Sequence, residues 1–336
     1  MTRPTVFITG VAGFLGSHLA GRFLHQGSRV IGCDNLLGGY RDNVPKGTEF
    51  HQIDCLDLEA LTAAMKGVDT VYHCAATAYE GLSVFSPLLV TQNIVAASVA
   101  TFTAGIRSGV GKIVFCSSMA RYGTNEVPFS EEMEPRPQDP YGIGKAAAEA
   151  YLRNLCQVHG VDWVICVPHN IYGPRQKYND PFRNVAAIMI NLMLQGRQPI
   201  IYGDGTQKRC FSFIEDDLPV LTRLATEESV VGEIINIGPD EEFVTINKLA
   251  QTIAELLEFE LDPVYVAGRP QEVELANCSA DKARKLLGYR TRYTLREGLE
   301  QTIQWIARKG PGPFDYHLPL EIQNGKCPQT WVSRLF

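Results

Sequence analysis

A glycine-rich turn near the N-terminus constrains the fold of this chain more than any other feature. Gly10, Gly13 and Gly16 follow an apolar run at residues 5–8, which predicts a short buried strand. The next residues, 15–24, predict an amphipathic helix. At such a helix N-terminus, free backbone N–H groups and the positive end of the helix dipole can hold a pyrophosphate. Glycine lets the backbone approach the phosphates where a Cβ would block it, so the turn predicts a nucleotide site.

An acid after the second predicted strand specifies this site further. Residues 29–33 predict a strand that ends in Asp34, about 20 residues beyond the glycines. An acid at this point accepts hydrogen bonds from the adenosine ribose hydroxyls and repels a 2′-phosphate. The pattern therefore favours NAD over NADP as the cofactor. The alternative interpretation is a tight turn followed by a solvated aspartate.

Strand-like and helix-like segments alternate through the first half of the chain, which is typical of a parallel sheet covered by helices on both faces. The predicted strands end near Gly10, Asp34, Asp54, Ala75, Ser118 and Pro168, and the predicted helices occupy 15–26, 57–66, 88–108 and 141–159. The second half is less regular, with predicted helices at 182–195, 246–258 and 297–308 and a strand at 199–202. We therefore expect an α/β fold, a Rossmann-type doubly wound parallel sheet with a smaller mixed α/β C-terminal substrate lobe.

This pattern also suggests a division into domains. We expect residues 1–168 to form the NAD-binding domain, and the segment 208–245 to return to it. The substrate lobe would comprise residues 169–207 and 246–313. The remaining residues, 314–336, would form an extended C-terminal arm.

Composition excludes several classes of protein. The net charge of −6 over 336 residues offers no basic surface for nucleic acid. No run of 18 apolar residues predicts a membrane span, and the N-terminus leads directly into the first strand without a signal peptide. The nine cysteines are scattered without a C-x-x-C pair, so we expect reduced, buried thiols rather than metal ligands. These features indicate a cytoplasmic protein without a metal site.

A second constellation carries the chemistry. Residues 112–116 predict a buried strand that leads to Ser118, and Tyr141 and Lys145 lie four residues apart at the start of a predicted helix. Positions i and i+4 share a helix face, so the phenol and the ammonium can point into one cleft. A phenol titrates near pH 10 in water, so a base near pH 7 needs a shift of about three units, or roughly 4 kcal/mol. Lys145 and the positive nicotinamide ring could supply that shift.

These motifs resemble the extended short-chain dehydrogenase/reductase family, in particular its nucleotide-sugar epimerases and dehydratases, over residues 4–308. The resemblance implies that Ser118, Tyr141 and Lys145 are catalytic. It also implies that Asn93, on a helix, is more structural than catalytic. The NAD site that it implies comprises Gly10, Gly13, Phe14, Leu15, Gly16, Asp34, Asn35, Asp54, Cys55, Ala75, Ala76, Tyr141, Lys145, Pro168 and His169.

The same resemblance implies a UDP-sugar substrate. Tyr202 would flank the uracil, and Asn170, Arg209 and Arg269 would contact the diphosphate. Glu272 would bind ribose hydroxyls, and Ser118 the reacting sugar oxygen. The alternative is that the two arginines are surface charges and Tyr202 a core residue. Three cations after a Gly-Pro turn could bind a uronic acid carboxylate or be solvated loop charges, and they are Arg175, Lys177 and Arg183.

One departure from the family pattern indicates the reaction. Met119 and Ala120 stand where the family's 4,6-dehydratases carry an Asp-Glu pair, and its decarboxylases usually keep the Glu. Without those acids the site can transfer hydride reversibly but cannot expel water. We therefore expect epimerisation at C4 of a UDP-hexose or UDP-uronic acid through a 4-keto intermediate. The alternatives are a net oxidoreductase or decarboxylase acting on a UDP-sugar and, more remotely, a non-catalytic NAD sensor.

Two further expectations concern assembly and the arm. The helices at 88–108 and 141–159 carry apolar residues beyond one face, and the family pairs two such helices in a four-helix dimer core, so we expect a homodimer. The residues concerned are Leu88, Val95, Val99, Phe102, Tyr151, Leu152 and Leu155. The arm is rich in aromatic residues, so we expect it to dock on the enzyme or its mate through Trp331 and Phe336. The alternative is a frayed terminus.

Overall fold

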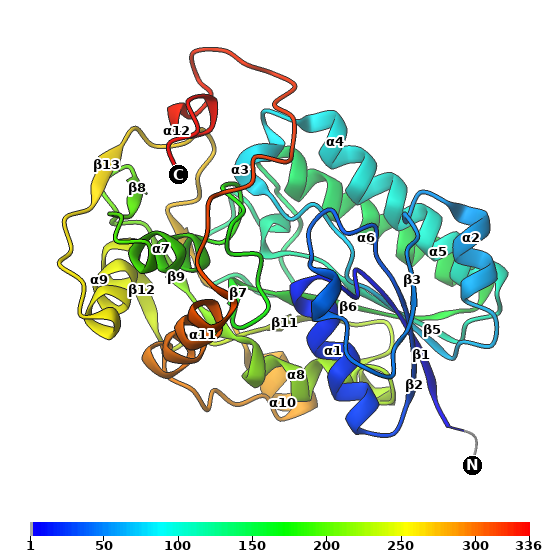
Figure 1. Ribbon diagram of the computed structural model, residues 1–336. Helices are drawn as coiled ribbons and strands as arrows, with labels where there is room; N and C mark the ends of the chain where they lie inside the picture. The colour runs from blue at the N-terminus through cyan, green and yellow to red at the C-terminus, as the bar shows by residue number, and fades with distance from the viewer. Residues whose placement is uncertain (1–2) are drawn as a thin grey trace.

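A seven-stranded parallel sheet forms the centre of the computed structural model, which describes residues 3–336 (Figure 1). The strand order is β11-β6-β5-β4-β1-β2-β3. The strands are β1 Thr5–Thr9, β2 Arg29–Cys33, β3 Glu49–His51, β4 Thr70–His73, β5 Lys112–Cys116, β6 Asp162–Pro168 and β11 Ile234–Ile237. The order reverses beside β1, which is the doubly wound topology, so the predicted fold class is confirmed. β11 pairs with β6 at one edge, Ile234 opposite Ile165.

Helices cover both faces of the sheet, and alternate residues of each strand pack against them. One face carries α1 Phe14–His25, α8 Ile214–Arg223 and α10 Asp281–Leu287, and the other carries α2 Leu58–Ala64, α5 Ala97–Arg107 and α6 Pro140–His159 (Figure 1). Within β1, Val6 and Ile8 belong to the first hydrophobic cluster and Phe7 to the second. This alternation places buried side chains on both faces, as a sheet between two helical layers requires.

The helix expected at 88–108 contains an irregularity. It runs through α4, Pro87–Thr91, a π-helical turn at Gln92–Ala96, and α5. Among residues 3–336, this stretch Pro87–Arg107 is the one helix long and apolar enough, by length and composition, to cross a membrane. It packs instead against α2 and α6 in the helical layer. A π-helical turn inside a helix often accompanies a functional site, and Asn93 on this turn faces the cavity described below.

The second half of the chain forms a smaller mixed lobe beside the carboxyl ends of the strands (Figure 1). Its elements are β7 Ile171–Tyr172, α7 Val185–Leu194, β8 Ile200–Tyr202, β9 Lys208–Cys210, β10 Ser212–Phe213, β12 Phe243–Thr245, α9 Ile246–Leu257, β13 Val264–Val266, β14 Leu275–Ala276 and α11 Leu295–Lys309. The helix expected from 182 starts at Val185, because Asn184 caps it by accepting from the Ala186 N–H. The helix expected from 297 starts at Leu295, because Thr294 and Glu297 form a capping box.

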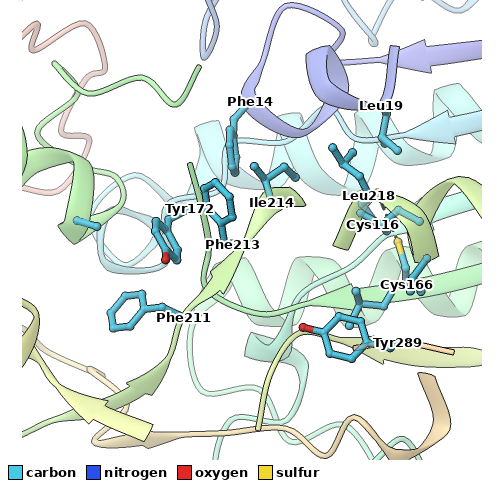
Figure 2. Packing of buried hydrophobic residues seen from close by; sticks show 14 of the residues in the cluster. Phe14, Leu19, Cys116, Cys166, Tyr172, Phe211, Phe213, Ile214, Leu218 and Tyr289 are labelled. Carbon is cyan, nitrogen blue, oxygen red and sulfur yellow. Dashed lines mark hydrogen bonds between the residues drawn. The ribbon is translucent and has the colours of Figure 1, made fainter. Parts of the chain in front are cut away.

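One continuous hydrophobic core joins this lobe to the sheet. Figure 2 shows Phe14 and Leu19 of α1 in the same cluster as Tyr172, Phe211 and Phe213 of the lobe. The rings of Tyr172 and Phe213 lie 5.6 Å apart. Buried apolar contact of this extent resists sliding of one lobe on the other. The cleft between them therefore has a defined shape.

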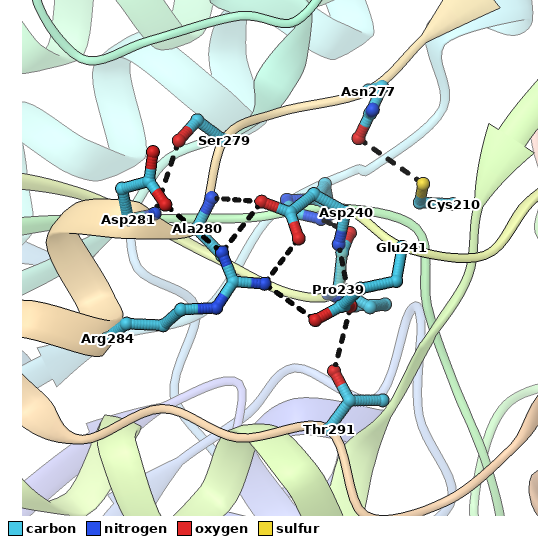
Figure 3. A network of polar contacts seen from close by, with 11 residues as sticks. Cys210, Pro239, Asp240, Glu241, Asn277, Ser279, Ala280, Asp281, Arg284 and Thr291 are labelled. Atoms are coloured by element: carbon cyan, nitrogen blue, oxygen red, sulfur yellow. Dashed lines mark hydrogen bonds and ion pairs between the residues drawn. The ribbon is translucent and has the colours of Figure 1, made fainter.

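A polar network fixes the loop after β11. Arg284 of α10 contacts the carboxylates of Asp240 and Glu241, the latter at 2.7 Å (Figure 3). Asp240 also accepts from the Ala280 N–H at 3.0 Å. The neighbouring Pro239 carbonyl accepts a hydrogen bond from the ring of His169, 2.8 Å away. The network therefore sets the surroundings of His169 at the end of β6.

The C-terminal arm, residues 314–336, is mostly extended and ends in α12, Gln329–Val332 (Figure 1, red). It packs in a third hydrophobic cluster with residues of α3, Glu80–Ser83, and of the substrate lobe. The Trp331 side chain is 2% exposed and that of Phe336 is 8% exposed. Both residues lie in this cluster, so the aromatic side chains of the arm rest on the body of the protein.

Candidate active site

A cavity of about 420 Å³ lies at the carboxyl ends of the strands, between the sheet and the smaller lobe. In doubly wound folds, ligands bind at this edge of the sheet where the strand order reverses. The predicted site residues that line it are Gly10, Gly13, Phe14, Leu15, Gly16, Asp34, Asn35, Asp54, Cys55, Ala75, Ala76, Ser118, Tyr141, Lys145, Pro168, Asn170, Tyr202, Arg209, Arg269 and Glu272. The cavity thus brings together the two predicted halves of the site.

The glycine turn is packed so closely that side chains cannot replace its hydrogens. A Cβ on Gly16 would lie 2.2 Å from the carbonyl oxygen of Gly10, and Gly10 itself has a φ of +71°. A Cβ on Gly10 would lie 2.9 Å from the Ala75 backbone. This packing brings the N-terminus of α1 against the cavity with its first N–H groups available. The turn therefore fits a dinucleotide pyrophosphate.

Asp34 closes the second strand and faces the cavity. One carboxylate oxygen accepts from the Ala12 N–H at 2.9 Å and the other from the Leu36 N–H at 2.7 Å. Burial raises the pKa of Asp34 above its usual value, and these backbone hydrogen bonds oppose the rise. Each carboxylate oxygen keeps a second lone pair, which can accept from a ribose hydroxyl. The residue fits the adenosine end of NAD.

His73, the last residue of β4, links neighbouring segments of the fold and does not line the cavity. Its ring nitrogens contact the hydroxyls of Thr9, at 2.8 Å, and Ser98, at 2.9 Å. The Thr9 hydroxyl also accepts from the Ala75 N–H at 3.1 Å. Burial lowers the pKa of His73 to about 3, so the ring is neutral. This network places Ala75 and Ala76 at the cavity wall.

The three predicted catalytic residues meet in the cavity from two elements. Ser118 follows β5, and its hydroxyl accepts from the Ala120 N–H at 3.2 Å. Tyr141 and Lys145 lie on the first turns of α6, which begins at Pro140 because Asp139 caps it. The Lys145 ammonium donates to the Cys116 carbonyl at 2.7 Å and lies 5.9 Å from the centre of the Tyr141 ring.

Burial dominates the protonation of this group. It raises the pKa of Tyr141 above the ordinary value, while hydrogen bonding to Ser118 opposes the rise. Burial also lowers the pKa of Lys145 to about 8. The expected lowering of the phenol pKa combined the charges of Lys145 and the nicotinamide ring, and in the protein itself burial outweighs the opposing contributions. The phenol is therefore protonated at neutral pH until further positive charge enters the cavity.

The substrate-side residues form a charged wall across the cavity. Arg269 pairs with Glu272, with nitrogen–oxygen distances of 2.9 and 3.2 Å, and its guanidinium lies 4.6 Å from the centre of the Tyr202 ring. Arg209 donates to the Glu274 carbonyl at 3.1 Å. Asn170 has a φ of +46° and donates to the Cys210 carbonyl at 2.9 Å. Because these groups line the cavity, the surface-charge interpretation is less consistent with the structure than a ligand-facing role.

Comparison with known proteins agrees with this geometry. The NAD dependent epimerase/dehydratase family matches residues 6–238. The chain belongs to this family. A curated UDP-glucose 4-epimerase from Mycolicibacterium smegmatis is 32% identical, over 90% of this chain and 98% of that protein.

Solved structures of the family have the same fold. The UDP-glucose 4-epimerase of Thermotoga maritima, solved with UDP-glucose, is 30% identical with a TM-score of 0.85 and covers 91% of this chain and 99% of its own. The UDP-glucuronic acid 4-epimerase of Bacillus cereus, solved with UDP-glucuronic acid and NAD, is 26% identical with a TM-score of 0.85. It covers 91% of this chain and 100% of its own. The family is NAD-dependent, which confirms the predicted cofactor.

Three residues that the sequence offered for the site lie outside the cavity lining. His169 is fully buried outside the cavity lining, and its ring Nε2 donates to the Pro239 carbonyl at 2.8 Å. Arg175 donates to the Ser17 carbonyl at 3.0 Å and does not line the cavity. Lys177, 3.8 Å from the carboxylate of Asp315, is also outside the lining. Of the three cations considered for a uronic acid, Arg183 alone lines the cavity.

Glu80 is a cavity residue that sequence reasoning missed. It begins α3, and its side chain lines the cavity near Arg209 and Arg269. Burial within the cleft raises the pKa of Glu80 to about 7, and the neighbouring Asp139 carboxylate adds to the rise. In the sequence, an acid at the start of a short helix is typical of a solvated charge, because the helix dipole favours acidic residues at that position whatever their function. No sequence motif distinguishes Glu80 from such a solvated acid.

Proposed function

We propose that this protein is an NAD-dependent epimerase acting at C4 of a UDP-sugar. The observation that carries the proposal is the shared cavity, in which Ser118, Tyr141 and Lys145 lie with the nucleotide turn on one side and Arg209 and Arg269 on the other. A site of this form can hold a dinucleotide and a sugar diphosphate at once. The two forked guanidinium groups suit phosphate oxygens.

The catalytic residues provide proton transfer to and from one sugar oxygen. Tyr141 takes the proton of the C4 hydroxyl through its phenol oxygen, and Ser118 holds that oxygen by hydrogen bonding. When bound, NAD would supply the hydride acceptor and donor, and its positive ring would add charge that lowers the phenol pKa. Lys145 binds the nicotinamide ribose from the same helix face. The 4-keto sugar would turn in the cavity before reduction from its opposite face, and Tyr141 would then return the proton to the C4 oxygen.

The residues after Ser118 support epimerisation over elimination. Met119 and Ala120 are buried and apolar where an acid pair would be needed to expel water. Glu80 lies on α3 instead, close to the phosphate-binding arginines. An oxidoreductase or decarboxylase acting on a UDP-sugar is the alternative: a net oxidoreductase would accumulate NADH in proportion to product, and a decarboxylase would release CO2 from a uronic acid and form a pentose.

The charges around the sugar pocket favour an uncharged sugar. Arg183 lines the cavity, donates to the Gly38 carbonyl at 3.2 Å and lies 5.3 Å from the centre of the Tyr79 ring, next to Glu80 in the chain. Glu80 lines the same cavity, near Arg209 and Arg269. A uronic acid carboxylate placed beside Glu80 would be repelled by the Glu80 carboxylate, so the proposal of an uncharged sugar rests on this residue, and a UDP-uronic acid bound by Arg183 is the alternative. We propose a UDP-hexose as the preferred substrate.

We also propose a cytoplasmic homodimer that pairs through α4, α5 and α6. Leu88 is 62% exposed and Tyr151 is 48% exposed, and Val95, Val99 and Leu155 are partly exposed on the same helices. Phe102 and Leu152 were expected on this face, but both are fully buried against the sheet because they lie on the opposite side of their helices. The free cysteines support a reducing compartment.

A panel of UDP-sugars tests the function directly. The protein is incubated with UDP-glucose, UDP-galactose, their N-acetylated forms and UDP-glucuronate, and the products are identified by NMR while NADH is followed by absorbance. The proposal requires C4 epimers without net NADH. Net NADH or a pentose product would establish the alternative reaction instead. Light scattering at micromolar concentration tests the dimer, and a mass near 37.2 kDa would exclude it.

A further inference from the structure

The C-terminal arm connects the two walls of the cleft. On the NAD-binding side, the Glu321 carboxylate accepts from the Leu88 and Leu89 N–H groups, at 2.9 and 2.8 Å, at the start of α4. On the substrate side, Arg197 donates to the Leu335 carbonyl at 2.9 Å. Figure 1 shows the arm running from α11 to α12 beside both walls. The arm is therefore held on both sides of the cavity.

Two consecutive residues of the arm contact groups that line the cavity. The buried Thr330 hydroxyl is hydrogen-bonded to the Tyr202 hydroxyl. Trp331 donates from its indole N–H to the Pro181 carbonyl at 3.2 Å. A Cβ on Gly81 would lie 3.3 Å from the Trp331 ring, so glycine lets the ring rest against α3 beside Glu80.

Phe336 itself belongs to the cavity lining. Its N–H donates to the Tyr316 hydroxyl at 3.1 Å, and its ring lies 5.5 Å from the ring of Phe314. The side chain is thus held in place by other residues of the arm. Ile200 and Tyr202 of β8 line the same cavity.

We propose that the arm is part of the substrate site, with Phe336 forming a wall of the pocket for the nucleotide base and Thr330 positioning Tyr202 beside it. The proposal rests on the proposed function. Arg269 lies over the Tyr202 ring, so a diphosphate held by this arginine directs its nucleoside toward β8 and the arm. An aromatic wall suits a base because every base presents a flat, polarisable face. The ligand class is a pyrimidine nucleoside diphosphate.

Calorimetry of UDP binding to the NAD-loaded enzyme tests the proposal. We expect Phe336→Ala to weaken UDP binding about tenfold, the loss of one base–aromatic contact, and to raise KM with kcat unchanged. NAD affinity should not change. Val332→Ala is the matched control, because this α12 side chain is exposed and lies outside the cavity lining. It should bind UDP like the wild type.

A second pair of variants separates positioning from folding. Thr330→Val keeps the shape of the side chain but removes the hydrogen bond to Tyr202, so KM should rise several-fold with kcat unchanged. Thr330→Ser keeps the hydroxyl, so its KM should be close to that of the wild type. Wild-type UDP affinity and KM in both Phe336→Ala and Thr330→Val would overturn the proposal. The proposal would also be overturned if these variants lowered the NAD affinity and the melting temperature without a specific loss of UDP affinity. If the wild type epimerises a UDP-sugar and the variants match it, the arm proposal alone is wrong. If the wild type binds no UDP, the proposed function fails with it.

Discussion

The cofactor half of the cavity is formed mainly by backbone groups, whereas the substrate half is formed mainly by side chains. The cofactor half relies on backbone, with Gly10 and Gly16 packed so that an added Cβ would lie within 3 Å of main-chain atoms. The substrate half relies on side chains such as Glu80, Arg209 and Arg269, which come from separate segments. Arg209 donates to the Glu274 carbonyl, and Arg269 pairs with Glu272. A backbone-built site tolerates almost no substitution, whereas a side-chain-built site can change its ligand one residue at a time. This contrast matches a family that keeps one cofactor while its members act on different sugars.

The largest expected effect tests the backbone half. Gly16→Ala should lower the free energy of unfolding by about 3 kcal/mol or more and abolish NAD binding, because the new methyl would lie 2.2 Å from the Gly10 carbonyl oxygen. Gly21→Ala on the same helix is the control, since its Cβ would have no neighbour nearer than 3.8 Å. It should be about 1 kcal/mol more stable than the wild type. Thermal melting with and without NAD measures both, and equal behaviour of the two variants would contradict the contrast.

The catalytic residues lie between the two halves, so a variant that loses only the catalytic group should still bind both NAD and UDP. Tyr141→Phe removes the phenol oxygen but keeps the ring, so kcat should fall by about 10²-fold or more while NAD and UDP still bind. Tyr151→Phe, at an exposed position on the same helix, is the matched control. NMR of the sugar epimers gives the rates. Activity of Tyr141→Phe within a few-fold of the wild type would remove this residue from the mechanism.

Asp34 is the side-chain element of the cofactor half. Asp34→Ala should weaken NAD binding about tenfold. The substitution removes the carboxylate that accepts from the Ala12 and Leu36 N–H groups, and the ribose hydroxyls of NAD lose the same acceptor. NADP should lose less affinity, since the repulsion of its 2′-phosphate also disappears. Calorimetry with both cofactors on Asp34→Ala and Asp34→Asn measures the ratio. Equal NAD and NADP affinities in the wild type would show that Asp34 does not discriminate.

The smallest effect concerns the charge of the sugar pocket. Glu80 is protonated below its pKa of about 7 and charged above it. The repulsion of a uronic acid should therefore weaken as the pH falls through 7, and the ratio of kcat/KM for UDP-glucuronate to that for UDP-glucose should rise roughly fivefold. In Glu80→Gln the ratio should be high at every pH. A flat ratio in the wild type, or an unchanged ratio in the variant, would remove Glu80 from sugar selection.

Much of the NAD half was determined by the sequence alone. The glycine turn, Asp34 and the spacing of Tyr141 and Lys145 are local patterns, in which a few neighbouring residues have to adopt one conformation to do their task. Strand and helix periodicity added the doubly wound sheet, because burial on both faces leaves a continuous apolar signature in each strand. For His169, the position at the end of a strand did not predict the direction of the side chain. Its ring is hydrogen-bonded to the Pro239 carbonyl and does not line the cavity.

Tertiary structure alone decided how the substrate half is assembled. Glu80, Phe336 and Tyr202 are far apart in the chain and carry no common motif, and only the packing of the arm against α3 and β8 brings them to one cavity. The same holds for Arg175 and Arg183, which looked alike in sequence but lie outside and inside the lining. The physical reason is that long-range contacts depend on the summed packing of whole elements, whereas a motif depends on local backbone geometry.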